Sequence, residues 1–254
     1  MNARAQRYGI LAACLAVAFA SAARPAHAET PLSGKEIVAR VDDVMSAPAD
    51  QDVESTIVLI DKAGNRKERT IQMLQKGANT RLARFLSPAD QKGISVLSLP
   101  DGSIYLYLPA FKKVKRIASH VKNTSFADTD FTYDDMEAKR YSERYAAELA
   151  RTEPDAYVVS LVPGSSEAGA SSKLLMWVRK DTFVPLTIEY YDAKGALARR
   201  MTSERIEKIG KYWVAREREM LNVATGHKTR MITTKVKFDS GIADAVFTTR
   251  YLER

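Results

Sequence analysis

The stretch of sequence that decides the fold is GISVLSLPDGSIYLYLPAFKKVKRIASHVKNTSFADTDFTYDDME, residues 93–137. Two apolar runs, Val96–Leu99 and Ile104–Leu108, flank Pro100–Ser103, whose Pro-Asp-Gly order is typical of a tight turn. This pattern predicts a β-hairpin. Both strands are apolar on both faces, with aliphatic residues on one side of the second strand and tyrosines on the other. We therefore expect other parts of the chain to cover both sides of the sheet here.

A basic strand follows the hairpin. Its charged residues are Lys112, Lys113, Lys115 and Arg116. Such a run fits a solvated edge strand, in which lysines prevent pairing with other chains. It equally fits an electrostatic contact with anionic lipid or with an acidic partner.

The next segment, residues 125–136, places aromatic residues among acids. The pattern predicts a short helix or loop that lays its apolar side chains onto an apolar surface. These side chains are Phe126, Phe131 and Met136.

Residues 108–136 resemble the outer membrane lipoprotein-sorting proteins, which are relatives of the periplasmic lipoprotein carrier LolA. The matching features are Leu108-Pro109, the lysine-rich Val114-Lys115-Arg116-Ile117, Phe126, and Thr129–Met136. The specific motif covers about 30 residues, and the order of elements fits over most of the chain. The resemblance implies a curled sheet with a helix in its mouth, which acts in outer membrane lipoprotein sorting.

The first 28 residues have the pattern of an export signal. A basic start precedes the apolar core Ile10–Ala23, and Ala26-His27-Ala28 matches an A-x-A cleavage site. We expect residues 1–28 to be removed, so that the protein begins at Glu29 in the periplasm. Acylation at Cys14 is the alternative, but the apolar run continues past this cysteine, which favours cleavage without acylation.

Loss of this signal would lower the formal net charge from +8 to +5, because it contains three arginines and no acid. A weakly basic exported chain is not expected to bind nucleic acid. Cys14 is the only cysteine, so the mature chain would have no disulfide or thiolate chemistry. Residues 29–254 contain no linker between two independent patterns, which predicts one domain.

The remaining sequence predicts an α+β fold that is mainly antiparallel β. Ser33–Glu36 forms a capping box for a helix with Ile37, Val41 and Val44 on one face. Downstream, the hydrophobic period changes to two, and roughly eleven strands follow at hairpin spacing. We expect one strongly curved sheet that forms a half-open, unclosed β-barrel, with short helices as a lid.

Residues 139–150 are ambiguous between helix and strand. Tyr141, Tyr145 and Leu149 recur every four residues, which favours a helix. The neighbouring strands favour a strand, and tertiary context often overrides local preference. We interpret the segment as a strand.

No motif for catalysis or metal binding is present. The chain lacks HExxH, GxGxxG, a P-loop and a nucleophile elbow. His120 and His227 are predicted to be surface residues, since no other metal ligand is near them in sequence. The acids of residues 128–135 lack the EF-hand spacing and are interpreted as solvated caps. We therefore predict that the protein is not an enzyme and needs no cofactor or metal.

The patterns and the resemblance together predict a monomeric periplasmic carrier that shields the acyl chains of a lipoprotein or lipid. Its partner would be an inner-membrane transporter or an outer-membrane acceptor. A lipid or lipoprotein sensor, or an accessory subunit of a membrane transporter, is the main alternative, and a hydrolase is the least favoured class.

The predicted ligand-binding residues are a cavity wall and its lid. For each wall residue, ordinary core packing is equally compatible with the sequence. The Arg/Glu pairs of residues 204–205 and 216–219 are interpreted as polar outer faces of strands. Methionines suit an adaptable cavity, although core packing is their usual role. The wall residues are Leu97, Leu99, Ile104, Leu106, Leu108 and Trp177; the lid residues are Phe126, Phe131 and Met136; the methionines are Met73, Met201, Met220 and Met231.

Overall fold

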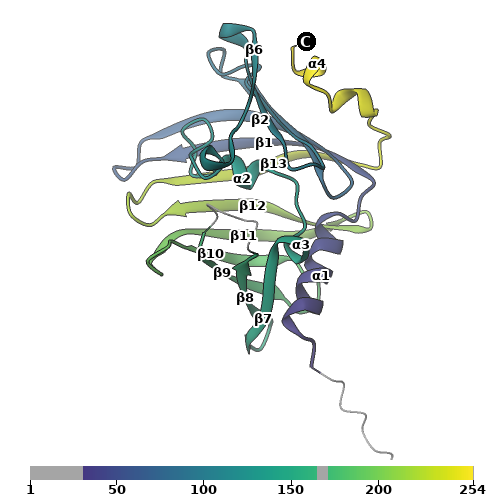
Figure 1. Cartoon of the computed structure of the whole chain (residues 1–254), viewed down its shortest axis with the longest axis vertical. Helices are drawn as coiled ribbons and strands as arrows, with labels where there is room; N and C mark the ends of the chain where they lie inside the picture. Colours follow the sequence, from purple (N-terminus) through teal and green to yellow (C-terminus); the bar gives the residue numbers. More distant parts are fainter. Residues whose placement is uncertain (1–30, 165–170, 254) are drawn as a thin grey trace, which may run out of the picture. The chain divides into compact units, whose positions relative to one another are not determined.

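A computed structural model describes residues 31–164 and 171–253 (Figure 1). The chain divides into two units, Met1–Pro31 and Leu32–Arg254. The predicted signal of residues 1–28 lies outside the described residues. None of the described helices is long and apolar enough to cross a membrane.

Thirteen strands in the described residues form a single antiparallel sheet, where the sequence predicted roughly eleven. The short β4 and β6, with four residues each, correspond to the first strand of the predicted hairpin and to the predicted basic strand. The strands are β1 (Asp50–Ile60), β2 (Arg66–Lys76), β3 (Thr80–Ser87), β4 (Ser95–Ser98), β5 (Ile104–Leu108), β6 (Lys113–Arg116), β7 (Tyr145–Thr152), β8 (Ala156–Pro163), β9 (Lys173–Arg179), β10 (Pro185–Tyr191), β11 (Leu197–Ile209), β12 (Tyr212–Asn222) and β13 (Lys228–Phe238).

The sheet is a meander whose two halves are joined in the middle. The order is β6-β5-β4-β3-β2-β1-β13-β12-β11-β10-β9-β8-β7, so each strand pairs with its neighbours in sequence except where β1 meets β13 (Figure 1). In the described part of the chain, β6 and β7 are edges that do not pair with each other, so the sheet stays open. This confirms the predicted fold class.

One hydrophobic core lies on the inner face of the sheet. It joins Val96 and Ile104, from strands near one edge, to Val159 and Leu161 of β8, near the other edge. Side chains from strands so far apart in the sheet can share one core only if the sheet curves around them. The curvature expected from the sequence is therefore present.

Both faces of the β4–β5 hairpin are covered, as its sequence predicted. On the inner face, Ile104 packs in the core with Phe126. On the outer face, Leu97 packs with Phe247 and Leu252 of the C-terminal segment. This segment contains the short helices η3 (Asp244–Val246) and α4 (Thr249–Leu252).

The helix α1 (Gly34–Met45) begins at the predicted capping box. The Ser33 side chain accepts a hydrogen bond from the backbone N–H of Glu36, and the Glu36 carboxylate accepts one from the backbone of Ser33. Ile37, Val38 and Val41 are fully buried in the inner core, and the helix packs on β7 and β8 (Figure 1).

Residues 139–150 contain both of the structures that the sequence left open. The single-turn helix α3 (Tyr141–Arg144) is followed directly by β7. The four-residue spacing of the tyrosines thus belongs to one helical turn, and the strand interpretation holds from Tyr145 onward.

Candidate ligand cavity

A cavity of about 210 Å³ lies between the inner face of the sheet and the residues around α2 (Tyr133–Met136) and α3. It exceeds a 150 Å³ apolar cavity of the kind that binds benzene, although pockets for drug-sized ligands reach about 300–1,000 Å³. The space suits part of a hydrocarbon chain. Its lining is mostly apolar and aromatic, and includes Val53, Met73, Phe131, Met136, Tyr141, Tyr145, Leu174, Ile188, Tyr190, Met201, Ala215, Met220 and Met231.

The segment of residues 125–136 covers one side of this cavity. A capping box starts α2, because the backbone N–H of Asp135 donates to Thr132 Oγ1 at 3.2 Å and that of Thr132 donates to Asp135 Oδ2 at 2.8 Å. Phe131 and Met136 line the cavity. Phe126 instead stacks on Phe85, with ring centroids 5.4 Å apart, and is part of the core.

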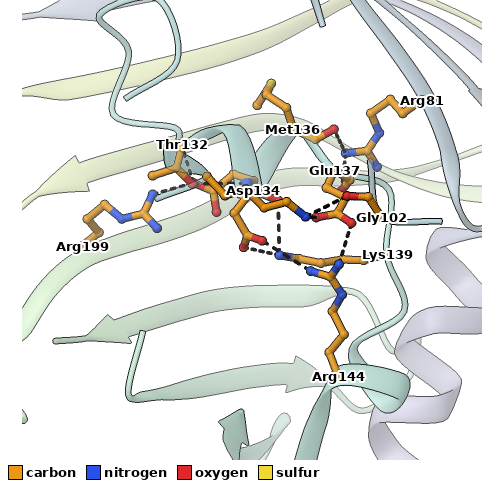
Figure 2. A network of polar contacts seen from close by, with 11 residues as sticks. Arg81, Gly102, Thr132, Asp134, Met136, Glu137, Lys139, Arg144 and Arg199 are labelled. Carbon is orange, nitrogen blue, oxygen red and sulfur yellow. Dashed lines mark hydrogen bonds and ion pairs between the residues drawn. The ribbon is translucent and has the colours of Figure 1, made fainter. Parts of the chain in front are cut away.

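Ion pairs hold this segment in place (Figure 2). Asp135 lies 2.5 Å from Arg199 of β11, and Glu137 lies 2.5 Å from Arg144 of α3. Asp134 pairs with Lys139. The predicted solvated caps are thus wrong for Asp134 and Asp135, because both carboxylates are largely buried against cations. They are also wrong for Asp130, whose carboxylate is buried against His227 and Thr229.

The pKa of Asp135 reflects this pairing. Burial raises it, but the Arg199 guanidinium and the hydrogen bonds from Arg199 and Thr132 outweigh burial and lower the pKa below its ordinary value of 3.8. The carboxylate is therefore charged at neutral pH. Removing one partner of such a buried pair is strongly destabilising, because the other charge is left without compensation.

Two arginines face the cavity without such compensation. Arg81 of β3 donates to Gln75 Oε1 at 2.7 and 3.0 Å. It also donates to the carbonyl oxygens of Met136 and Glu137 at 3.4 and 3.3 Å (Figure 2). Arg218 of β12 also lines the cavity. Across residues 31–164 and 171–253, no carboxylate lies within 4.0 Å of either guanidinium.

The pKa values of these arginines are lowered. Burial, and then the positive charge of Arg218, lower the pKa of Arg81 from 12.5 to about 10. Burial likewise lowers the pKa of Arg218. Both side chains remain cations at neutral pH, so the mostly apolar cavity is lined by two arginine cations in addition to Lys139, which is paired with Asp134.

The cavity only partly coincides with the predicted wall and lid. Phe131 and Met136 line it. Ile104, Leu106 and Phe126 belong to the inner core outside the lining, Leu97 and Leu99 belong to the outer cluster, and Leu108 is half-buried on β5. The cavity lies instead over β1–β3 and β9–β13, and all four predicted methionines line it.

Trp177 points away from the inner core. Leu174, Met176 and Val178 of β9 are buried in that core, and Trp177 lies between them in the alternation. Its Nε1 donates to Glu153 Oε1 at 3.3 Å, and Arg151 lies over its ring. Trp177 was predicted to line the cavity wall because it is apolar, and this prediction is wrong. The alternation along β9 was the signal that its side chain lies on the outer face.

Neither Arg81 nor Arg218 was predicted from the sequence to line a cavity. The interpretation of residues 216–219 as a polar outer face is wrong for Arg218, although Arg216 forms an exposed pair with Glu207 at 2.5 Å. Arg218 has the same parity as Met220, which is fully buried. Parity alone did not single out Arg218, because Arg216 shares it but pairs with Glu207, and Ala215 of the opposite parity lines the cavity.

The basic strand β6 is an edge strand, as predicted. Lys112, Lys113, Lys115 and Arg116 are all exposed, and Arg116 also donates to Ser103 Oγ at 2.9 Å. The Phe111 side chain, next to Lys112, is 67% exposed. An exposed aromatic ring therefore lies among four cations.

The polar residues expected at the surface form no metal site. Within the described residues, no group of three or more His, Cys, Asp or Glu side chains could hold a metal ion. His227 Nδ1 lies 2.6 Å from Asp130 Oδ2, and Thr229 Oγ1 donates to the same oxygen at 2.7 Å. These contacts attach the segment that covers the cavity to β13.

Comparisons with known proteins agree with this architecture. A family model described as "-like: Uncharacterized protein" matches residues 77–254. No curated protein matches the chain. A domain from Vibrio parahaemolyticus that is described as an outer membrane lipoprotein-sorting protein domain has 28% identity and a TM-score of 0.79, with 87% of this chain and 98% of that chain covered.

Two further solved structures are similar. A DUF1329 family protein from Desulfovibrio piger has 26% identity and a TM-score of 0.81, with 86% of this chain and 97% of that chain covered. A LolA superfamily protein from Nitrosomonas europaea has 18% identity and a TM-score of 0.74, with 87% of this chain and 100% of that chain covered. At 18% identity, the similarity to the Nitrosomonas europaea protein shows a shared fold only.

Proposed function

The chain belongs to the family of outer membrane lipoprotein-sorting proteins related to LolA, and we propose from this premise that it is a periplasmic carrier of acyl chains. The observation that supports the proposal is the apolar, methionine-lined cavity on the inner face of the open sheet. Burial of each methylene would contribute about 0.8 kcal/mol. Partial burial of one chain is therefore sufficient for transport.

The mechanism needs only burial and release. The acyl chain would enter between the sheet and the segment that contains Phe131 and Met136 and displace side chains that adapt easily, such as the methionines. No covalent step is involved. Release would follow when the segment returns and the cavity becomes smaller.

Bound lipid tests the proposal directly. The protein purified from its native host would be extracted with organic solvent, and the extract analysed by mass spectrometry. Lipid or lipoprotein acyl groups in an amount comparable to the protein are expected. An extract without acyl compounds, together with failure of the protein to take up any lipid in vitro, would contradict a carrier.

The processing of residues 1–28 belongs to the same proposal. Cleavage before Glu29 would deliver the protein to the periplasm without a lipid anchor. Intact mass of the protein from its native host is expected to match residues 29–254. A mature chain that begins at an acylated Cys14 would contradict this and indicate attachment to a membrane.

A sensor or transporter subunit is the second candidate, and the exposed edge β6 favours it. Phe111 and the neighbouring cations form a surface that suits an anionic membrane or an acidic partner. A carrier also needs such a docking surface, for an inner-membrane transporter or an outer-membrane acceptor. A stable protein partner with little bound lipid would distinguish the sensor from the carrier.

A further inference from the structure

We propose that Arg81 and Arg218 bind the anionic headgroup of an amphiphile whose hydrocarbon chain fills the apolar part of the cavity. This inference rests on the proposed function and adds the chemical class of the ligand. The anionic group would be a carboxylate or a phosphate, since the guanidinium fork matches both.

The charged side chains that line the cavity do not balance one another. Two carboxylates line it, those of Asp135 and Glu137. Lys139 also lines it, and its charge is balanced by Asp134. Asp135 is paired with Arg199, while Glu137 is paired with Arg144 and Lys122. Both acids are therefore already neutralised by cations other than Arg81 and Arg218. The two remaining positive charges call for an anion that the described chain does not supply.

Neither the Arg81 nor the Arg218 guanidinium forms an ion pair with a carboxylate among the described residues. Arg81 is oriented by the neutral oxygen of Gln75 and by two main-chain carbonyl oxygens. The Glu137 carboxylate offsets part of its charge from a distance, but forms no ion pair with it. Arg218 has no hydrogen-bond partner among the described residues. Positive charges held in a mostly apolar site without a counterion are costly. Binding of an anion would offset this free-energy cost, because it supplies the missing counterion.

The apolar lining of the cavity favours an amphiphile over a free anion as the ligand. The four methionines Met73, Met201, Met220 and Met231 surround the space next to the arginines. A small hydrated anion would leave this apolar surface in contact with water. An amphiphile would cover it with hydrocarbon and place its charge at the guanidinium groups.

The experiment compares a fluorescent polyene fatty acid with its methyl ester on the unmodified protein. The two probes share the hydrocarbon chain and differ at the headgroup, which is an anion in the acid and a neutral methyl ester in the other. The acid is expected to bind at least about tenfold more tightly, as one charge-assisted hydrogen bond contributes. Inorganic phosphate alone is expected to displace the acid poorly, because it lacks the hydrocarbon chain.

The outcomes separate this inference from the proposed function. Equal binding of acid and ester would overturn the headgroup site and leave an acyl-chain carrier. Binding of neither probe would overturn both. Displacement of the acid by inorganic phosphate as readily as by unlabelled fatty acid would overturn the amphiphile and indicate a free-anion site.

Substitutions then assign the effect to the arginines. Arg218→Met should abolish the preference for the acid while the ester still binds, because the methionine keeps the apolar contact. Arg216→Met is the matched control on the same strand, since Arg216 is outside the cavity lining and is paired with Glu207. It should keep the preference. A preference that survives in Arg218→Met would overturn the assignment.

Thermal unfolding without ligand provides a readout that does not depend on binding. Arg218→Met should melt at or above the temperature of the unmodified protein, because an uncompensated charge has been removed. A fall in melting temperature larger than that of Arg216→Met would show that Arg218 has a structural partner, and would overturn its role as a free cation.

Discussion

Asp50 illustrates how a single carboxylate fixes a long segment of this protein. Its Oδ1 accepts hydrogen bonds from the backbone N–H and the hydroxyl of Ser240, both at 2.8 Å. Its Oδ2 accepts from the N–H groups of Gly241 and Ile242 at 2.8 and 3.1 Å. Burial raises the pKa of Asp50, but these hydrogen bonds together outweigh burial and lower the pKa below 3.8. The C-terminal segment that covers the outer face starts from this turn.

Replacing Asp50 should loosen that segment and change the response to acid. Because the pKa is lower in the folded state, the carboxylate stabilises the fold above its unfolded pKa, and this contribution is lost as the pH falls through the folded pKa. Asp50→Asn should cost about 1–3 kcal/mol at pH 7 and much less at acidic pH. Urea unfolding at both pH values measures this.

A turn aspartate provides the control for Asp50→Asn. The side-chain hydrogen bonds of Asp61 stay within its own turn, chiefly with Asn65. Asp61→Asn should therefore cost less than Asp50→Asn. An equal cost for both variants would show that the Asp50 carboxylate does not fix the C-terminal segment.

Phe126 and Phe131 should respond differently to truncation, although they lie five positions apart. Phe126 is 1% exposed and stacked in the core, so Phe126→Ala should cost about 3–5 kcal/mol. Phe131 lines the cavity, so Phe131→Ala should cost less stability and weaken acyl-probe retention more. Chemical unfolding and probe affinity per folded molecule test this. Equal probe retention in folded Phe131→Ala and the unmodified protein would contradict a lid role for Phe131.

The contact between α1 and β7 depends on a residue without a side chain. A Cβ atom at Gly34 would lie 2.5 Å from the backbone carbonyl carbon of Glu148 and from the backbone nitrogen of Leu149. Backbone atoms in a sheet cannot move aside as a flexible side chain can. The first turn of α1 therefore sits at a distance that only glycine permits.

Gly34→Ala should consequently destabilise the protein, although alanine is the better helix former by about 1 kcal/mol. Overpacking of this kind typically costs about 1–3 kcal/mol. Lys35→Ala, in the same turn but exposed, is the control and should be nearly neutral. A thermal melt that shows Gly34→Ala to be as stable as Lys35→Ala would mean that α1 can shift away from β7 without loss.

Strands and helix starts were predictable because their signals are local. Alternation identified the meander, and the Ser33 capping box identified the start of α1. The position of the cavity was not predictable, since it depends on which strands the curvature brings opposite α2. The hairpin of residues 96–108 looked like the cavity wall because it is apolar on both faces, yet its outer face is covered by the C-terminal segment.

The curved sheet gives the protein two separate surfaces, a cavity on its inner face and a basic edge at β6. A carrier depends first on the cavity, whereas a sensor depends first on the surface that contacts its partner. The two functions can therefore be separated by changing one surface at a time. Ala215 lines the cavity and is nearly fully buried, while Lys113 and Lys115 are exposed on β6.

Ala215→Leu should fill part of the cavity at little cost in stability, because the added methyl groups enter empty space. Ala83→Leu is the control, since Ala83 is equally buried in the core but does not line the cavity. Overpacking there should cost about 1–3 kcal/mol without affecting lipid uptake per folded molecule. Melting curves and probe affinity measure both effects.

Complementation of a deletion strain then decides between carrier and sensor. For a carrier, Ala215→Leu should abolish lipid uptake and the phenotype together, because the acyl chain no longer fits. The double change Lys113→Glu and Lys115→Glu should weaken docking to an anionic surface and leave uptake in vitro intact. For a sensor, the charge change should be the more harmful of the two. Full complementation by a folded Ala215→Leu protein that no longer takes up lipid would exclude acyl-chain transport through this cavity.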